Sequence, residues 1–380
     1  MTEPAAGFGM LRRGCAAALH GAPGTVAATG GEERCGLALA ERHRVVPLLI
    51  AGLAAPEQEP FRRRALALVQ QTVRLEQELA AIAAVWSAAD VEFLVLKGPA
   101  LARQAYPVPE WRAYDDLDLW VATCDFDRAV AALERGGYRR QHPLSRRAAA
   151  CARRAGIEAA LVHPERGRLV EVAHGWPALA PTRRAAAEMT TAAVTLEIAG
   201  VRIRAPGSVH ALLYACQHGA HHSWDRLSWV ADVAGLWLRL GPTGHVQACE
   251  TARQWRMTTM LGLGLRLAAE HLGLQLENPA AALAALPRVR ALSARVRLEA
   301  VGAGPERAAM LDRLRFARDA RDTAGQRLRM IAGWIFTPTL GDIEVRPLPE
   351  ALYPLYALLR PLRLLRHPWR RDWRQLARSG

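Results

Sequence analysis

Lysine is almost absent from this 380-residue sequence: Lys97 is the only one, and arginine supplies the rest of the 50 basic residues. The formal net charge of +14 is therefore carried almost entirely by arginine. A preference for arginine often follows genome base composition, so the arginines alone indicate little. The single lysine is more informative, because an ammonium is a compact point charge and a guanidinium is a planar fork. Lys97 is therefore a candidate functional residue.

Paired cysteines and long apolar runs are also missing. The six cysteines are scattered and form no C-x-x-C pair, which argues against a zinc site or a disulfide framework. No apolar run approaches the ~18 residues of a membrane span, and the N-terminus lacks the apolar core of a secretory signal. These absences predict a cytoplasmic protein with reduced cysteines and no transmembrane segment.

The composition is that of a globular protein with a sizeable core, since 51% of residues are hydrophobic and 23% are charged. The positive charge should attract anions such as nucleotides, acidic peptides, nucleic acid or phospholipid surfaces. The alternative is a solvated arginine-rich surface. The same choice applies to the basic tail, Arg360 to Arg374, which either binds an acidic partner or packs through its leucines. Nothing in the sequence indicates an oligomeric state.

The hydrophobic pattern divides the chain into three parts. Residues 1–89 are predicted to form an N-terminal helical region, with clear helical spacing from Phe61 to Trp86 and weak patterning over 1–35. Residues 90–205 are predicted to form an α+β domain. Residues 206–380 are predicted to form a C-terminal helical region that begins with Ser208 as an N-cap and ends in the basic tail.

The central part alternates strand and helix signals, which predicts a mixed sheet with helices. The expected helices are Pro99–Tyr106 and Phe126–Arg135, the second closed by Gly136-Gly137. The expected strands are Val91–Leu96, Asp116–Val121, Ala159–His163 and Leu169–Ala173, followed by a hairpin of Ala193–Ile198 and Val201–Arg204.

Two aspartates mark the strongest candidate site. Asp116 and Asp118 are two residues apart on a predicted strand, so both side chains lie on one face. Paired carboxylates are costly unless a cation neutralises them, and their oxygens suit Mg²⁺. Glu171, on a later predicted strand, supplies a third acid of the kind that two-metal phosphoryl transfer requires. Alone, D-x-D is also common on solvated edge strands, and that alternative stays open here.

A turn precedes the aspartates and adds to the pattern. Gly98 can bring backbone N–H groups close to a phosphate at a helix N-terminus, and Lys97 can contact the phosphate as a point charge. The alternative for Lys97 is an ordinary exposed lysine at a strand end. Arg112 is expected either to neutralise a phosphate or to pair with Asp115.

Histidines follow on the predicted C-terminal helix. His218 and His222 are four residues apart and Asp225 is three further on, which places the three on one helix face. They are candidates for a zinc site, for lining a nucleotide or acceptor pocket, or for plain packing. His174, after Glu171, is a further candidate for the same pocket. The helical spacing of three tryptophans indicates packing in the core and not a platform on which bases stack; they are Trp224, Trp229 and Trp237.

These motifs together resemble a known family. The segments Leu96–Ala102, Asp115–Leu119, Glu171–Trp176 and His218–Trp224 resemble the uncharacterised bacterial nucleotidyltransferase family, often found beside clusters for ribosomally made peptides such as lasso peptides. That family looks like a branch of the DNA polymerase β superfamily. One departure lies at the turn, where the wider superfamily usually has Gly-Ser or Gly-Gly and this chain has Lys97-Gly98.

The resemblance implies a minimal nucleotidyltransferase fold and transfer of a nucleoside monophosphate from a nucleoside triphosphate to a hydroxyl or phosphate, with a modified peptide or small molecule as acceptor. Two Mg²⁺ ions would be held by Asp116, Asp118 and Glu171. Nucleic acid is a less expected partner. The alternatives are a catalytically silent scaffold and a transferase that uses a nucleotide sugar. The residues expected to contact the nucleotide are Lys97, Gly98, Arg112, His174, His218, His222 and Asp225.

Overall fold

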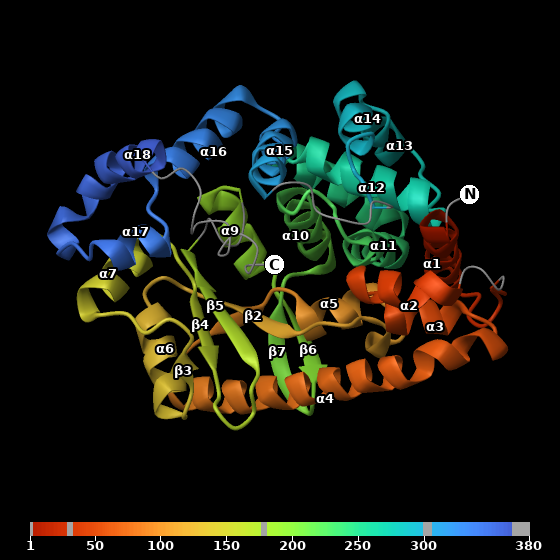
Figure 1. The fold of residues 1–380 in the computed structure, drawn as a ribbon, viewed down its shortest axis with the longest axis horizontal. Helices are drawn as coiled ribbons and strands as arrows, with labels where there is room; N and C mark the ends of the chain where they lie inside the picture. Colours follow the sequence, from red (N-terminus) through yellow and green to blue (C-terminus); the bar gives the residue numbers. More distant parts are fainter. Residues whose placement is uncertain (1–2, 29–32, 176–180, 299–305, 367–380) are drawn as a thin grey trace.

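The computed structural model describes residues 3–28, 33–175, 181–298 and 306–366 (Figure 1). A five-stranded mixed sheet lies at the centre, with helical regions at both ends of the chain. The predicted α+β fold class is therefore confirmed. The part of the basic tail beyond residue 366, which includes Arg370 and Arg374, lies outside the described residues.

The sheet has the order β1-β2-β5-β4-β3. Its central pair, β2 and β5, is parallel, and the other neighbouring pairs are antiparallel. A separate antiparallel hairpin of β6 and β7 has β7 in contact with β1. The strands are β1 (Phe93–Val95), β2 (Asp116–Val121), β3 (Arg139–Arg140), β4 (Ala159–Val162), β5 (Leu169–His174), β6 (Val194–Ile198) and β7 (Val201–Ala205).

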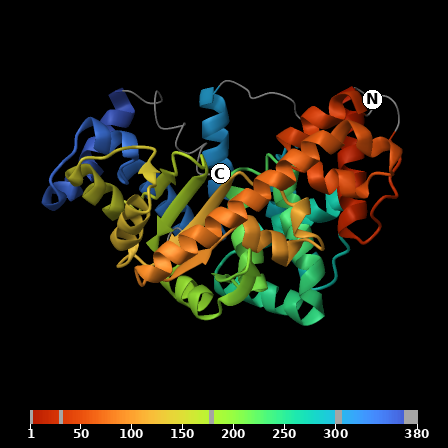
Figure 2. The ribbon, with the colours of Figure 1, turned by 90° about the horizontal axis from the view of Figure 1, so that it is seen from below.

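One face of the sheet is apolar and packs on two helices. Leu117, Leu119, Val170 and Val172 are fully buried there, in the same core cluster as side chains of α4 (Glu59–Ala88) and α6 (Phe126–Arg135). Figure 1 shows α4 running beneath the sheet, and Figure 2 shows it crossing the molecule when seen from below. Because alternate residues of a strand point to opposite faces, Asp116, Asp118 and Glu171 lie on the other face.

The helical regions from the two ends of the chain pack together. The helices α1 (Glu3–Leu19), α2 (Glu33–Arg42) and α3 (Val46–Gly52) share one core cluster with α10 (Ser208–His221), α11 (Leu227–Gln254) and α12 (Thr258–Leu272). Within this core α11 also crosses α5 (Gly98–Ala105), and an added Cβ at Gly235 would lie 2.2 Å from the carbonyl oxygen of Ala105. Only glycine allows this approach of the two backbones.

Two sequence expectations about the helices need correction. Helix α1 lies in the stretch 1–35 that was expected to be weakly patterned. Helix α10 begins at Ser208, but its N-cap is Gly207 and no side chain caps it. Ser208 is therefore the first residue of the helix, and its predicted capping role is wrong.

The C-terminal helices form a separate small cluster with α7 (Arg146–Arg154). Figure 1 shows α17 and α18 beside α7, and Leu340, Ile343 and Tyr356 are buried together with Cys151. Among the described residues, no helix is long and apolar enough to cross a membrane. The remaining elements are η1 (Pro56–Gln58), η2 (Pro109–Trp111), α9 (Arg183–Thr191), α13 (Ala280–Ala284), α14 (Pro287–Ser293), α15 (Glu306–Asp319), α16 (Ala324–Phe336), α17 (Leu340–Val345), η3 (Glu350–Leu355) and α18 (Tyr356–Arg366).

Candidate active site

Four carboxylates lie in a row on the polar face of the sheet. Asp116 and Asp118 alternate with buried leucines on β2, and Asp118 is the register partner of Glu171 on the parallel strand β5. Glu171 in turn lies opposite Ala160 of β4, and Glu158 precedes that residue by two positions. Because neighbouring strands lie roughly 4.8 Å apart, the alternation brings all four acids onto one surface. Glu158 is a member of the row that none of the sequence motifs contained.

Burial and mutual repulsion make this row electrostatically costly. Burial, followed by the charges of Glu158, Asp118 and Asp116, raises the pKa of Glu171 to about 9. Burial and then Asp118 raise the pKa of Asp116 to about 6, and the same two causes raise the pKa of Glu158 to about 6. A raised pKa means that the folded protein disfavours the charged form, so the row carries more negative charge than its surroundings offset.

Lys97 supplies one positive charge to the row. Its Nζ lies 2.9 Å from Oδ1 of Asp118, and both side chains are nearly buried. Burial, the largest single cause, lowers the pKa of Lys97, but the charge and hydrogen bond of Asp118 together with Tyr214 and Asp116 outweigh it and raise the pKa. The lysine is therefore a buried counter-ion of Asp118 and not an exposed residue at a strand end. Gly98 follows with φ +54°, in the left-handed region that favours glycine.

Arg112 does not pair with Asp115, which corrects one sequence expectation. Its Nε and Nη2 donate to the two carboxylate oxygens of Asp232 on α11, at 2.8 and 3.0 Å. Asp115 is held instead by Arg44, 2.8 Å away, and by Gln71. The sequence could not reveal these pairs, because each joins segments far apart in the chain.

His218 and His222 lie beside the row. The rings of His218 and His222 are 4.7 Å apart, and each contacts the ring of Trp229. Burial, followed by neighbouring positive groups, lowers the pKa of His222 to about 3, and burial also lowers that of His218. Both imidazoles are therefore neutral at pH 7. In the described part of the chain no three His, Cys, Asp or Glu side chains are placed to hold a metal as they stand, so nothing supports a zinc site here.

Asp225 and His174 are not part of this arrangement. Helix α10 ends at His221, and Ser223 and Trp224 then adopt positive φ, so Asp225 is not on the same helix face as His218. Asp225 pairs with Arg313 at 3.2 Å. His174 is three residues from Glu171, an odd number, so it lies on the opposite face of β5, where its ring packs on Phe126 with centroids 4.1 Å apart.

A cavity borders the row at Asp116 and Asp118. It is lined by basic side chains from four separate segments, together with Tyr114, His218 and Trp229; the basic residues are Arg44, Lys97, Arg112 and Arg226. Tyr214, one turn before His218 on α10, also interacts with Lys97 and the acids. Trp224 and Trp237 are core residues, as expected, whereas Trp229 reaches the cavity wall. Arg44, Arg226 and Tyr214 were missed because only the tertiary fold brings them here.

A second cavity borders the other end of the row. Glu158 lines it, together with Phe126, His142, Ile157 and Leu340. The row therefore runs from a basic cavity at Asp116 to a more apolar one at Glu158.

The sequence matches, over residues 31–273, a family described as uncharacterised nucleotidyltransferase. The chain belongs to this family. The matched segment includes every residue of the basic cavity and of the acid row, so the family relationship applies to the site itself. Membership supports an enzyme that transfers a nucleotidyl group in the general sense. No curated protein and no solved structure matches the chain.

The donor chemistry of this nucleotidyltransferase site suits Mg²⁺. Carboxylate oxygens are the ligands that Mg²⁺ prefers, and repulsion among the acids adds to burial in raising the pKa values of Asp116 and Glu171, which a bound cation would oppose. One obstacle is that Lys97 already holds Oδ1 of Asp118. Since the acids are not placed to bind an ion as they stand, Mg²⁺ binding requires side-chain rearrangement around Asp118.

Proposed function

We propose that this chain is a Mg²⁺-dependent enzyme that transfers a nucleoside monophosphate from a nucleoside triphosphate to a hydroxyl or phosphate acceptor. The observation that carries the proposal is the convergence of Asp116, Asp118 and Glu171 on one face of a parallel strand pair. Family membership supports the transfer reaction, and the charge deficit of the row supports the metal requirement.

In this scheme Asp116, Asp118 and Glu171 would hold Mg²⁺, which when bound offsets charge on the phosphates and aligns them for attack. The acceptor oxygen forms a bond to the α-phosphorus, the bond to pyrophosphate breaks, and a carboxylate oxygen of the row takes the acceptor proton. Trp229 and the neutral His218 offer an apolar wall for the nucleoside beside the acids. The peptide nature of the acceptor is proposed from the sequence resemblance alone.

The experiment supplies the purified chain with Mg²⁺, each of the four ribonucleoside triphosphates labelled at the α-phosphate, and candidate hydroxyl or phosphate acceptors. The expected result is Mg²⁺-dependent pyrophosphate release with label on the acceptor. A parallel reaction with nucleotide sugars, read by the mass gained by the acceptor, tests the alternative donor. Label transfer without added divalent metal would contradict the proposal.

One observation favours a second candidate, a catalytically silent scaffold. The ion pair between Lys97 and Asp118 satisfies the central acid without a metal, which suits a protein that only binds a nucleotide or a partner. A scaffold of this kind would bind triphosphate with the same affinity in Mg²⁺ and in EDTA and would release no pyrophosphate. The labelling experiment therefore separates the two functions.

A further inference from the structure

We propose that Arg44, Arg112 and Arg226 form the subsite that holds the phosphate tail of the nucleoside triphosphate. This inference rests on the proposed function, keeps the phosphate role expected for Arg112, and adds Arg44 and Arg226, which were not among the expected site residues. It also gives the N-terminal helical region a part in substrate binding, because Arg44 lies between α2 and α3.

The three arginines reach one cavity from separate segments. Arg44 follows α2, Arg112 follows η2, and Arg226 is the N-cap of α11. All three line the cavity that also contains Asp116 and Asp118. A triphosphate in this cavity would therefore have its phosphates beside the carboxylates proposed to hold Mg²⁺.

The arginine charges here are incompletely balanced. The ion pair between Nε of Arg226 and Asp225 is long, at 4.0 Å, and Asp225 also serves Arg313. Burial lowers the pKa of Arg226, and the next largest cause is the like charge of Arg44. A cluster of cations next to a cavity creates a place where a polyanion is stabilised.

Arg112 provides independent support. Asp232 fixes its Nε and Nη2, and Tyr106 also donates to Asp232, so the guanidinium is held in one orientation. Its third nitrogen, Nη1, is buried and has no hydrogen-bond partner. A buried donor without a partner is costly, and a phosphate oxygen would satisfy it. Asp232 acts in this scheme as a positioning residue.

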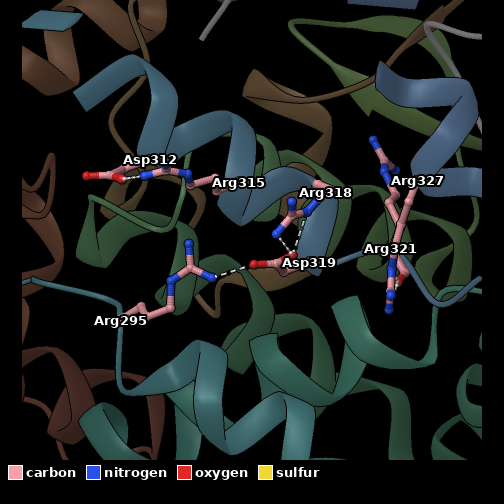
Figure 3. Close-up of polar contacts among 7 residues, drawn as sticks. All are labelled: Arg295, Asp312, Arg315, Arg318, Asp319, Arg321 and Arg327. Carbon is pink, nitrogen blue, oxygen red and sulfur yellow. Dashed lines mark hydrogen bonds and ion pairs between the residues drawn. The ribbon is translucent and has the colours of Figure 1, made fainter. Parts of the chain in front are cut away.

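Arginines elsewhere in the chain show a different pattern. Figure 3 shows α15, where Asp319 is contacted by Arg295 and Arg318, and Asp312 pairs with Arg315. In that helix neighbouring acids balance the arginines. The cavity arginines also have acid partners, since Arg44 contacts Asp115 and Arg112 contacts Asp232. The cavity differs because Nη1 of Arg112 has no hydrogen-bond partner and Nε of Arg226 lies 4.0 Å from Asp225, so both can still meet phosphate, for which their forked geometry is well suited.

The test measures binding by calorimetry for each ribonucleoside triphosphate, the matching monophosphates and inorganic tripolyphosphate, with Mg²⁺ present. Arg44→Gln and Arg226→Gln should each weaken triphosphate binding about 10-fold, and the double variant about 100-fold, because each removes a charged hydrogen bond. Monophosphate binding should change much less. Arg204→Gln is the matched control, because Arg204 lies on strand β7 of the hairpin and pairs with Glu92. Equal thermal unfolding midpoints check that the variants fold.

Each outcome is decisive. If the unchanged protein binds triphosphate and the double variant binds it equally well, the subsite is wrong while the proposed function stands. The subsite is also wrong if monophosphate binding falls as much as triphosphate binding. If the unchanged protein binds no triphosphate, the subsite and the proposed function are both overturned.

Discussion

Two buried groups of charges in this molecule are built in opposite ways. In the acid row, Asp116, Asp118, Glu158 and Glu171 share the one ammonium of Lys97. In the C-terminal cluster, the single carboxylate of Asp342 is contacted by Arg360 and Arg363, and also accepts hydrogen bonds from Thr339. The first group has too many acids for its cation, and the second has two cations for one acid.

The pKa values follow this difference in sign. Those of Asp116, Glu158 and Glu171 are raised. Burial also opposes the charge of Asp342, but the hydrogen bonds from Thr339 and the charges of Arg360 and Arg363 outweigh it and lower its pKa. A buried acid that is paired with cations stabilises the fold. A row of buried acids with too few cations destabilises it, and a bound cation would offset this cost. The comparison therefore separates a structural ion pair from a candidate active site without reference to a motif.

The largest expected effect is on catalysis. Asp118→Asn removes the central carboxylate with little change in shape, so nucleotidyl transfer should fall about 1,000-fold, which corresponds to about 4 kcal/mol of lost transition-state stabilisation. Initial rates of pyrophosphate release measure this. Asp127→Asn is the control, because Asp127 is an exposed carboxylate on α6 whose side chain is 75% accessible. Similar rates for the two variants would remove Asp118 from the reaction.

The next effect is on the stability of the C-terminal cluster. Asp342→Ala leaves Arg360, whose side chain is 3% exposed, without its buried partner, and should cost about 3 kcal/mol of unfolding free energy at pH 7. Because the pKa of Asp342 is lowered in the fold, its contribution is fully present above about pH 4, the unfolded value. It is lost as pH falls through the folded pKa. Urea unfolding at several pH values should show the two proteins converging in acid.

A smaller effect of opposite sign is expected in the row. Glu171→Gln replaces a carboxyl whose charged form the fold disfavours, because of burial and the neighbouring acids, and should stabilise the metal-free protein by about 1 kcal/mol at pH 7. Since the folded pKa is raised to about 9, the cost of Glu171 is absent below about pH 4.5 and grows as pH rises through this window. Urea unfolding in EDTA at pH 5, 7 and 8.5 tests the trend. A stabilisation that shrinks toward alkaline pH would contradict the charge imbalance.

The smallest effect concerns the one lysine. Lys97→Arg keeps the positive charge but replaces a point charge with a planar fork beside a single carboxylate oxygen. Transfer should fall about 5-fold, or about 1 kcal/mol. In Lys97→Met, which removes the charge but keeps a side chain of similar length, the transfer rate should fall much further. Equal losses in both variants would show that shape, and not charge, is the contribution of Lys97.

The sequence predicted four of the five strands of the sheet because local patterns determine them, whereas the two-residue edge strand β3 was not predicted. Strand β2 and helix α6 have the expected bounds, and the alternation of Asp116 with buried leucines placed the acids on one face. Helix α1 lies in the predicted N-terminal helical region, but its bounds were not predicted, because Gly and Ala give it little contrast between faces. His174 was misplaced by proximity in sequence, although counting three residues from Glu171 would have put it on the opposite face.

The rest of the site depends on contacts that no local pattern encodes. Arg44 lies more than 50 residues from Lys97 along the chain and reaches the cavity only because the N-terminal helices pack on α11. The partner of Arg112 is on α11, 120 residues away. Glu158 did have a local signal: it precedes a predicted strand by one residue and shares a face with the position opposite Glu171.

The contact between Gly235 and Ala105 has a consequence for how this site can evolve. Helix α5 begins at Gly98 and α11 bears Ser228 and Trp229, so both helices contribute residues to the lining of the basic cavity. Their separation is fixed where the carbonyl of Ala105 meets the missing side chain of Gly235. We expect that one added methyl group there would force the two helices to shift and so change the cavity wall without altering any charged residue. Substrate selectivity can thus drift through an uncharged position that touches no ligand, and a selection for altered nucleotide size should find changes at this crossing.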